Sequence, residues 1–306
     1  MYYSINIIRE LRQMTDRKKR ILAHILAILI IISLLGLSLF YDAYHTAPSR
    51  FQVRYETLDS VFIPNQMDDV TILYFSDLDY GTYMDYDRFA KLTNTINELS
   101  PDIIVFGGDL FDQAARVTDQ SRREVTELLS SMNAPLGKFA VPGDFDYLSP
   151  DLPQTVQEIL FDSGFELLVN SSIILRNNGS ESITLTGLDS GLYGHPDITA
   201  AFANISRAGY NIVVSHTPDL IEDVPSDLAD YALSGHSHGG QAYWVFGALY
   251  TPPMAEVMFR GKHTVKGLYT LDISNGVGTT IEDVRFLANA EVVLYRLKHH
   301  SVNEAE

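Results

Sequence analysis

Residues 70–81 read VTILYFSDLDYG. A run of apolar, β-branched and aromatic residues, typical of a buried strand, leads directly into a turn that carries two aspartates. Similar apolar runs return along the chain, as DIIVFG (102–107), KFAVP (138–142), SITLTGL (182–188), YNIVVS (210–215) and YALSG (231–235). Short strands that recur in this way predict one large domain built on β-sheets.

Helical patterns separate several of these predicted strands. Residues 84–100 and 117–132 place apolar side chains near i, i+3, i+4 and i+7, and the first pattern ends just before Pro101, where helices tend to stop. LYTLDI (268–273) and VVLYRL (292–297) then read as strands with no helix between them. We therefore expect an α/β domain over residues 61–298 whose C-terminal third is mostly β.

Acidic residues and histidines follow five of the predicted strands. Glycines next to these turns allow close approach of the backbone, and the carboxyl ends of strands are where open α/β sheets gather ligand sites. A lone aspartate in a loop is usually a turn or cap residue, but five such turns together favour a metal site. Its candidate residues are Asp77, Asp79, Asp109, Asp112, Asp144, Asp146, His216, His236 and His238. His45, His195, His299 and His300 are interpreted as structural or solvated.

The N-terminal region carries a candidate membrane anchor. Residues 21–41 form a 21-residue apolar run, about the length of helix needed to cross a hydrocarbon core of roughly 30 Å. The segment 1–20 is basic, which predicts a cytoplasmic N-terminus and a single-pass protein of the cell membrane whose main domain is extracytoplasmic. A cleaved signal peptide is the alternative. Residues 42–60 are expected to form a connector and 299–306 a polar tail.

The charge distribution excludes one class of partner. Residues 1–50 hold 7 of the 22 lysines and arginines and 3 of the 39 aspartates and glutamates, which leaves a net charge of −21 on residues 51–306. Such a charge repels polyanions, so nucleic acid is not an expected partner. The chain has no cysteine, which excludes disulfides and thiolate metal sites.

The order of these motifs resembles the calcineurin-like metallophosphoesterase superfamily, and more narrowly its membrane-anchored bacterial branch of predicted phosphohydrolases. The resemblance covers roughly residues 68–298 and includes VPGDFDY (141–147), LSGHSHGGQ (233–241), NGVGTT (275–280) and VRFLANAEVVLYRL (284–297). It implies a β-sandwich flanked by helices, with two divalent cations at the strand ends. One cation would be held by Asp77, Asp79, Asp109 and His238, and the other by Asp109, Asp144, His216 and His236. Such a centre would hydrolyse a phosphate ester.

Three positions depart from the family pattern. Asp79 and Asp144 stand where the family has a histidine and an asparagine, and both still offer oxygen ligands. Four ligand aspartates would cancel the charge of two divalent cations, and each added charge at 4 Å is worth about 4 kcal/mol at an effective dielectric of about 20. This oxygen-rich ligand set predicts Mn²⁺, Mg²⁺ or Fe rather than Zn²⁺.

Phe145 stands where the family has the histidine thought to assist the leaving group. A general acid typically contributes about 10²–10⁴-fold in rate, and Asp146 is the candidate substitute. Two interpretations follow. The chain is either a membrane-anchored phosphoesterase acting on a phosphorylated small molecule or lipid, such as a diester or an envelope-lipid phosphate, or a pseudo-enzyme that binds metal and a phosphorylated ligand or a protein partner.

Overall fold

The computed structural model describes residues 15–203, 205, 209–244, 247–248 and 251–300, and divides the chain into two units, 1–46 and 47–306. In the first unit, α2 (Asp16–Tyr41) is followed by the π-helical turn η1 (Asp42–Thr46). Within the described residues α2 is the one helix long and apolar enough to cross a membrane, which confirms the predicted apolar helix. It begins five residues before the expected start because the intervening lysines and arginines are good helix formers. Residues 1–14 of the predicted basic segment lie outside the described residues.

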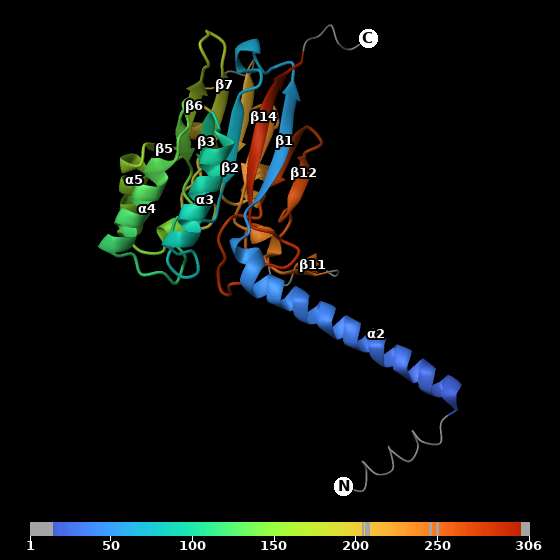
Figure 1. The fold of residues 1–306 in the computed structure, drawn as a ribbon. Coiled ribbons are helices and arrows are strands. Elements are labelled where there is room, and N and C mark those ends of the chain that lie inside the picture. The colour runs from blue at the N-terminus through green and yellow to red at the C-terminus, as the bar shows by residue number, and fades with distance from the viewer. Residues whose placement is uncertain (1–14, 204, 206–208, 245–246, 249–250, 301–306) are drawn as a thin grey trace, which may run out of the picture. The chain divides into compact units, whose positions relative to one another are not determined.

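The second unit is a sandwich of two six-stranded sheets (Figure 1). The first sheet has the order β1 (Gln52–Ser60), β14 (Glu291–His299), β2 (Thr71–Phe75), β3 (Ile103–Phe106), β4 (Lys138–Ala140) and β5 (Phe165–Leu167). The second has the order β12 (Gly261–Val265), β13 (Tyr269–Ile273), β9 (Tyr231–Ser234), β8 (Tyr210–Val214), β7 (Ile183–Gly187) and β6 (Ser171–Leu175). The predicted α/β sandwich with helices is confirmed.

Helices and short turns complete the unit. The outer face of the first sheet is covered by α3 (Tyr86–Leu99), α4 (Asp119–Ser131) and α5 (Leu152–Asp162). The remaining short elements are α6 (Ile198–Ala201), the hairpin of β10 (Tyr243–Trp244) and β11 (Gly247–Ala248), and the turns η2 (Ala47–Ser49), η3 (Asn65–Met67), η4 (Phe145–Tyr147), η5 (Asp219–Asp223) and η6 (His238–Gly240).

Alternation along the central strands builds the core. On β2, Ile72 and Tyr74 enter the cluster between the two sheets, whereas Leu73 and Phe75 enter the cluster beneath the helices. Both faces of this strand are therefore buried, which explains why its sequence is a continuous apolar run rather than an alternating one.

The predicted connector over residues 42–60 is wrong in its second half. Residues 52–60 form β1, which pairs in parallel with β14 over nine residue pairs at the edge of the first sheet. Leu58 is the single fully buried residue of β1, so the strand carries almost no apolar signal. The C-terminal boundary also differs, because β14 runs through His299, whose Nδ1 lies 2.6 Å from the carbonyl oxygen of Ile63. Residues 301–306 of the expected tail lie outside the described residues.

Strand direction brings the acidic turns together. In the first sheet β2, β3 and β4 are parallel, and in the second sheet β7, β8, β9 and β13 are parallel. Parallel strands end at the same edge of a sheet, so the turns that follow them lie side by side at one edge of the sandwich.

Candidate metal centre

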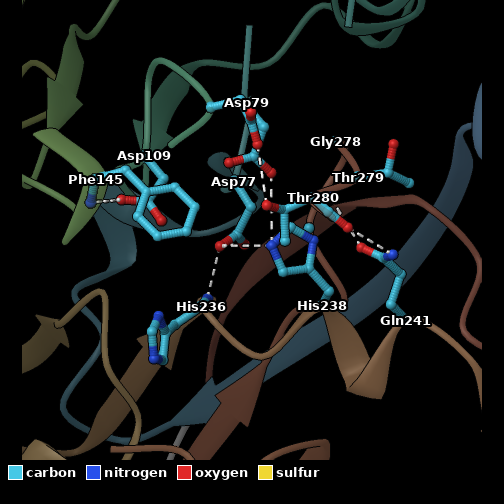
Figure 2. Close-up of polar contacts among 12 residues, drawn as sticks. Asp77, Asp79, Asp109, Phe145, His236, His238, Gln241, Gly278, Thr279 and Thr280 are labelled. Atoms are coloured by element: carbon cyan, nitrogen blue, oxygen red, sulfur yellow. Dashed lines mark hydrogen bonds and ion pairs between the residues drawn. The ribbon is translucent and has the colours of Figure 1, made fainter. Parts of the chain in front are cut away.

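Seven of the predicted site residues converge at this edge. Figure 2 shows Asp77, Asp79, Asp109, His236 and His238 among them. Each of the seven is at most 6% exposed to solvent. They are Asp77, Asp79, Asp109, Asp144, His216, His236 and His238. Buried charged groups are costly unless they are paired or coordinate a metal. A cluster of four aspartates and three histidines in the interior therefore requires an explanation beyond packing.

The backbone is strained at most of these positions. Five of the seven residues have positive φ values between 50° and 67°, and they are Asp77, Asp79, Asp109, His236 and His238. Such conformations cost of order 1–3 kcal/mol for non-glycine residues and cluster at functional sites. The turn at 275–280 approaches so closely that a Cβ at Gly278 would lie 2.8 Å from Asp79 Oδ2. The fold thus holds these side chains in directions that relaxed turns would not give.

One group of contacts surrounds His216. Its Nε2 lies 3.0 Å from Asp109 Oδ2, and it lies 3.7 Å from Asp144 Oδ2 and 3.9 Å from Asp77 Oδ1. His236 Nδ1 lies 3.1 Å from the same Asp144 oxygen. Within the described residues, Asp109, His216 and His236 offer ligand atoms that all lie within 4.8 Å of one another, close enough to share one ion.

A second group of contacts surrounds His238. Its Nε2 lies 3.5 Å from Asp79 Oδ2 and 3.9 Å from Asp77 Oδ1 (Figure 2). Asp77 therefore faces both groups, since its Oδ1 is also near His216. Asp109 also relates to both groups, since it contacts His216 and its charge acts on Asp79. Two adjacent subsites that share a carboxylate are the arrangement a two-cation centre requires.

Backbone carbonyl groups orient two of the imidazoles. His216 Nδ1 lies 2.7 Å from the oxygen of Gly107, and His236 Nε2 lies 2.8 Å from the oxygen of Pro253. A carbonyl oxygen can only accept, so each of these nitrogens is the protonated one in the neutral ring. The other nitrogen of each ring then faces the carboxylates with a free lone pair, as metal-binding histidines do.

Unsatisfied atoms show that the residues fit divalent cations. Among buried atoms without a hydrogen-bond partner are both oxygens of Asp79, Asp144 Oδ2 and His216 Nε2. An orphaned buried polar atom costs roughly 1–3 kcal/mol, and more when the group is charged. Asp79 Oδ2, Asp144 Oδ2 and His216 Nε2 face other members of the cluster, and all of these atoms are good ligands for a divalent cation.

The pKa shifts have the same cause. Burial, together with the charges of Asp109 and Asp77, raises the pKa of Asp79 well above its usual range. Burial raises the pKa of Asp109 to about 7 against the opposing effect of His216. Burial lowers the pKa of His216, but the charges of Asp109, Asp144 and Asp77 outweigh it and raise that pKa well above its ordinary value. The carboxylates repel one another, and divalent cations would relieve that repulsion.

Asp146, the predicted substitute acid, is held by backbone N–H groups. The carboxylate of Asp146 accepts hydrogen bonds from the backbone N–H groups of Gly143 at 2.8 Å, Leu110 at 2.9 Å and Asp109 at 3.2 Å. Burial raises the pKa of Asp146, and these hydrogen bonds oppose the rise. Both oxygens tie the turn after β4 to the turn after β3, so Asp146 is a structural cross-link and does not face the cluster as an acid.

Phe145 occupies the wall of the adjoining cavity. Its backbone N–H donates to Asp109 Oδ1 at 2.7 Å (Figure 2), while its ring lines a cavity of about 430 Å³ beside the cluster. Apolar residues form much of this wall, including Leu192, Pro252 and Ile281. The cavity is therefore open to a substituent with apolar surface.

Sequence reasoning missed the residues that support the cluster. The guanidinium of Arg285 is 1% exposed and donates to the carbonyl groups of His238, Asn275, Gly276, Gly278 and Ala288. Nothing in VRFLANAEVV marks its arginine as buried. The side chain of Gln241 likewise bonds the backbone of Thr280 and Glu282. Together they fasten the turn after β13 to the turn after β9.

Asp112 and the histidines that were interpreted as structural or solvated lie outside the cluster. Asp112 is buried, but its oxygens accept from Thr82, Ala114 and Thr280. His195 donates its backbone N–H to Asp189, and His300 Nδ1 lies 3.2 Å from Asp59. His45 packs its ring against Tyr41 in the first unit. The structure gives these residues structural contacts only.

Comparison with known proteins shows the family of the chain. The model of the family described as calcineurin-like phosphoesterase matches residues 70–240, more than half of the chain. The uncharacterized metallophosphoesterase YkuE of Bacillus subtilis (strain 168) is 30% identical over 257 residues, which cover 84% of this chain and 88% of that protein. The uncharacterized metallophosphoesterase Cj0846 of Campylobacter jejuni is 28% identical over 279 residues, covering 90% and 71% of the two chains.

One relative has a named activity. The UDP-2,3-diacylglucosamine pyrophosphatase LpxG of Chlamydia muridarum is 27% identical over 282 residues, covering 74% of this chain and 82% of that protein. The family match and the similarity to YkuE extend over the strands and turns that build the cluster. The chain belongs to the calcineurin-like phosphoesterase family.

Proposed function

We propose that the chain is a membrane-anchored, metal-dependent phosphoesterase. The observation that carries this proposal is the convergence of seven buried ligand-type side chains, several with orphaned atoms, at one edge of the sandwich. Asp77, Asp79, Asp109 and His238 would hold one divalent cation. Asp109, Asp144, His216 and His236 would hold the other. Such a pair supplies an activated water and charge stabilisation for attack on phosphorus.

The surrounding residues define what the chain itself contributes. Gly107 and Pro253 fix the imidazoles of His216 and His236 through their carbonyl groups, so both side chains are preorganised. Four ligand carboxylates would bring two divalent cations to neutrality, which weakens attraction for a phosphate dianion. A phosphodiester or a phosphoric anhydride with less charge at the reacting phosphorus therefore suits the site better than a monoester.

The cavity supports a substrate with an apolar part. Among the described residues that line it there is no lysine or arginine, whereas Leu192, Ala242 and Val284 contribute apolar surface. An envelope-lipid phosphate has such an apolar part. The named activity of the relative LpxG, on a diacylated sugar nucleotide, supports the same class. Hydrolysis of a pyrophosphate bond expels a phosphate group, which needs little protonation and so fits a site with phenylalanine in the acid position.

A pseudo-enzyme is the second candidate, and Phe145 is the observation that favours it. With Asp146 engaged by three backbone N–H groups, neither residue supplies a proton to a leaving group. In that case the centre would bind metal and a phosphorylated ligand or a protein partner without turnover. The two functions predict the same metal content and opposite results in an assay of hydrolysis.

The assay uses the 306-residue chain purified in detergent, with bis(p-nitrophenyl) phosphate as substrate. We expect turnover that requires Mn²⁺, stops with chelator and falls to background in Asp109→Asn. The matched control is Asp102→Asn, because Asp102 precedes β3, whereas Asp109 follows it, and its carboxylate accepts hydrogen bonds from the backbone N–H and hydroxyl groups of Thr71, away from the cluster. That variant should keep the activity. Two bound metal ions without turnover would assign the pseudo-enzyme function instead.

The anchor sets the location of the site. The apolar α2 supports attachment to a membrane, and we infer that the basic residues before it remain cytoplasmic while the acidic domain lies on the opposite side. This orientation would give the site access to phosphorylated components of the envelope.

A further inference from the structure

The two oxygens of Asp144 have different surroundings. Oδ1 accepts a hydrogen bond from the hydroxyl group of Ser190 and another from the backbone N–H of Leu192 at 3.2 Å. Oδ2 has no hydrogen-bond partner and lies 3.1 Å from His236 Nδ1 and 3.7 Å from His216 Nε2. One oxygen is thus held by donors from the loop after β7, and the other is left for the metal centre.

The donor role of Ser190 is fixed by its neighbours. The backbone N–H of Tyr193 donates to Ser190 Oγ at 3.1 Å, so the serine hydroxyl already accepts one hydrogen bond. The backbone N–H of Ser190 donates in turn to Asp189 at 2.8 Å. Ser190 is fully buried, and within these contacts the carboxylate of Asp144 is the acceptor for its proton. A serine hydroxyl group can rotate to suit its partners, but here its partners leave one direction for the hydroxyl hydrogen, toward Asp144.

An asparagine would fail at this position for a simple reason. An amide has one oxygen and one NH₂ group, and the NH₂ group cannot accept hydrogen bonds or bind a cation. If the amide oxygen faced Ser190 and Leu192, the NH₂ group would face the metal centre. If the oxygen faced the metal centre, the NH₂ group would meet the N–H of Leu192. Only a carboxylate satisfies both sides at once.

We propose that Ser190 is a positioning residue that, together with the Leu192 amide, matches position 144 to a carboxylate and aims Asp144 Oδ2 at the metal centre. The aspartate that replaces the family's asparagine is then an integral part of this site and not a remnant of a lost ligand. This inference rests on the proposed function, because it assumes that the centre holds cations.

The test measures metal binding rather than activity alone. The chain is purified in detergent, stripped with chelator and titrated with Mn²⁺ by calorimetry. Asp144→Asn, the family residue, should weaken one of the two Mn²⁺ affinities by about 10–100-fold, and Ser190→Ala should weaken the same one by about tenfold, as changes around metal ligands do. Mn²⁺ affinity in Asp144→Asn equal to or above that of the natural chain would overturn the proposal.

A double-mutant cycle tests the hydrogen bond without metal. We expect the change in Tm that Asp144→Asn causes in the metal-free chain to be more favourable in the Ser190→Ala background than in the natural one, because the clash of donors is partly removed. Additive changes would overturn the proposal. Ser163→Ala, which deletes a buried hydroxyl group bonded to Thr126 O outside the site, is the matched control and should leave Mn²⁺ affinity unchanged. If the natural chain bound no Mn²⁺, the proposed function would fail, while this cycle would still decide the match between Ser190 and Asp144.

Discussion

The backbone and the side chain of Phe145 have different roles. Its backbone N–H donates to Asp109 at 2.7 Å, whatever the side chain, and its ring forms part of the cavity wall. A change of side chain therefore alters the chemistry at the wall and keeps the hydrogen bond that orients Asp109.

We predict that Phe145→His raises the rate of hydrolysis of an alkyl phosphodiester by about tenfold or more, a part of the roughly 10²–10⁴-fold that a general acid contributes. The gain should be smaller for a nitrophenyl ester, whose leaving group needs no proton. The measurement is kcat for both substrates with Mn²⁺.

Phe145→Leu is the control for this prediction, since it removes the ring and adds no titratable group. It should leave the rate on the alkyl ester unchanged. Equal rates for Phe145→His and Phe145→Leu on that ester would mean that a missing acid does not limit the protein.

At the residue scale, the sequence predicts the members of the cluster but not their supports. Asp77, Asp109 and His216 were found because each follows an apolar strand, and strand direction alone brings such residues to one edge. The carbonyl groups of Gly107 and Pro253 belong to backbone whose path depends on the whole fold. No residue pattern encodes where a carbonyl group points.

At the scale of the elements, the turn after β13 depends on Arg285. Its guanidinium bonds five carbonyl groups, and through Gly278 that turn lies directly against Asp79. Burial lowers the pKa of Arg285 to about 10, so the group remains charged near neutral pH. This cation also lies close enough to Asp77 and Asp79 to offset part of their repulsion.

We predict that Arg285→Met lowers the free energy of unfolding by about 3 kcal/mol or more, because buried carbonyl groups lose their donors at roughly 1–3 kcal/mol each. Chemical denaturation of the metal-free chain in detergent measures the change. Arg122→Met removes an arginine of α4 whose pair with Glu158, at 2.8 Å, is exposed, and it should cost at most about 1 kcal/mol. Similar losses for the two variants would contradict the role given to Arg285.

The sequence predicts the buried central strands better than it predicts the elements at the edge of the fold. The strands β2 and β3 begin and end within one residue of the apolar runs at 70–75 and 102–107, because both of their faces are buried and their sequences are almost entirely apolar. The edge strand β1 was read as connector, since its register with β14 and not its composition makes it a strand. The helix α5 was also missed, although its buried residues Val156, Ile159 and Leu160 follow a helical spacing.

At the scale of the whole molecule, charge and hydropathy divide the chain. A basic N-terminal segment and an apolar helix precede a domain with a net charge of −21. The natural absence of cysteine makes the proposed orientation easy to test, because a single introduced thiol has no competitor.

We predict that Ser180→Cys, at an exposed position between β6 and β7, reacts with a membrane-impermeant maleimide on intact cells. Ser4→Cys, in the basic segment before α2, should react only after the cells are lysed. The reverse labelling pattern would place the domain in the cytoplasm. Labelling of Ser180→Cys in the medium, free of cells, would indicate a cleaved signal peptide.

The position of β14 has a consequence for biogenesis. The final strand of the domain lies between β1 and β2, parallel to the former and antiparallel to the latter. The strands β1 and β2 do not pair with each other, so they stay unconnected in the sheet until β14, which ends at residue 299, has been synthesised. A chain that is truncated before residue 291 therefore leaves β1 and one edge of β2 without a partner strand. Unpaired strand edges promote aggregation, so such a chain is a substrate for quality control.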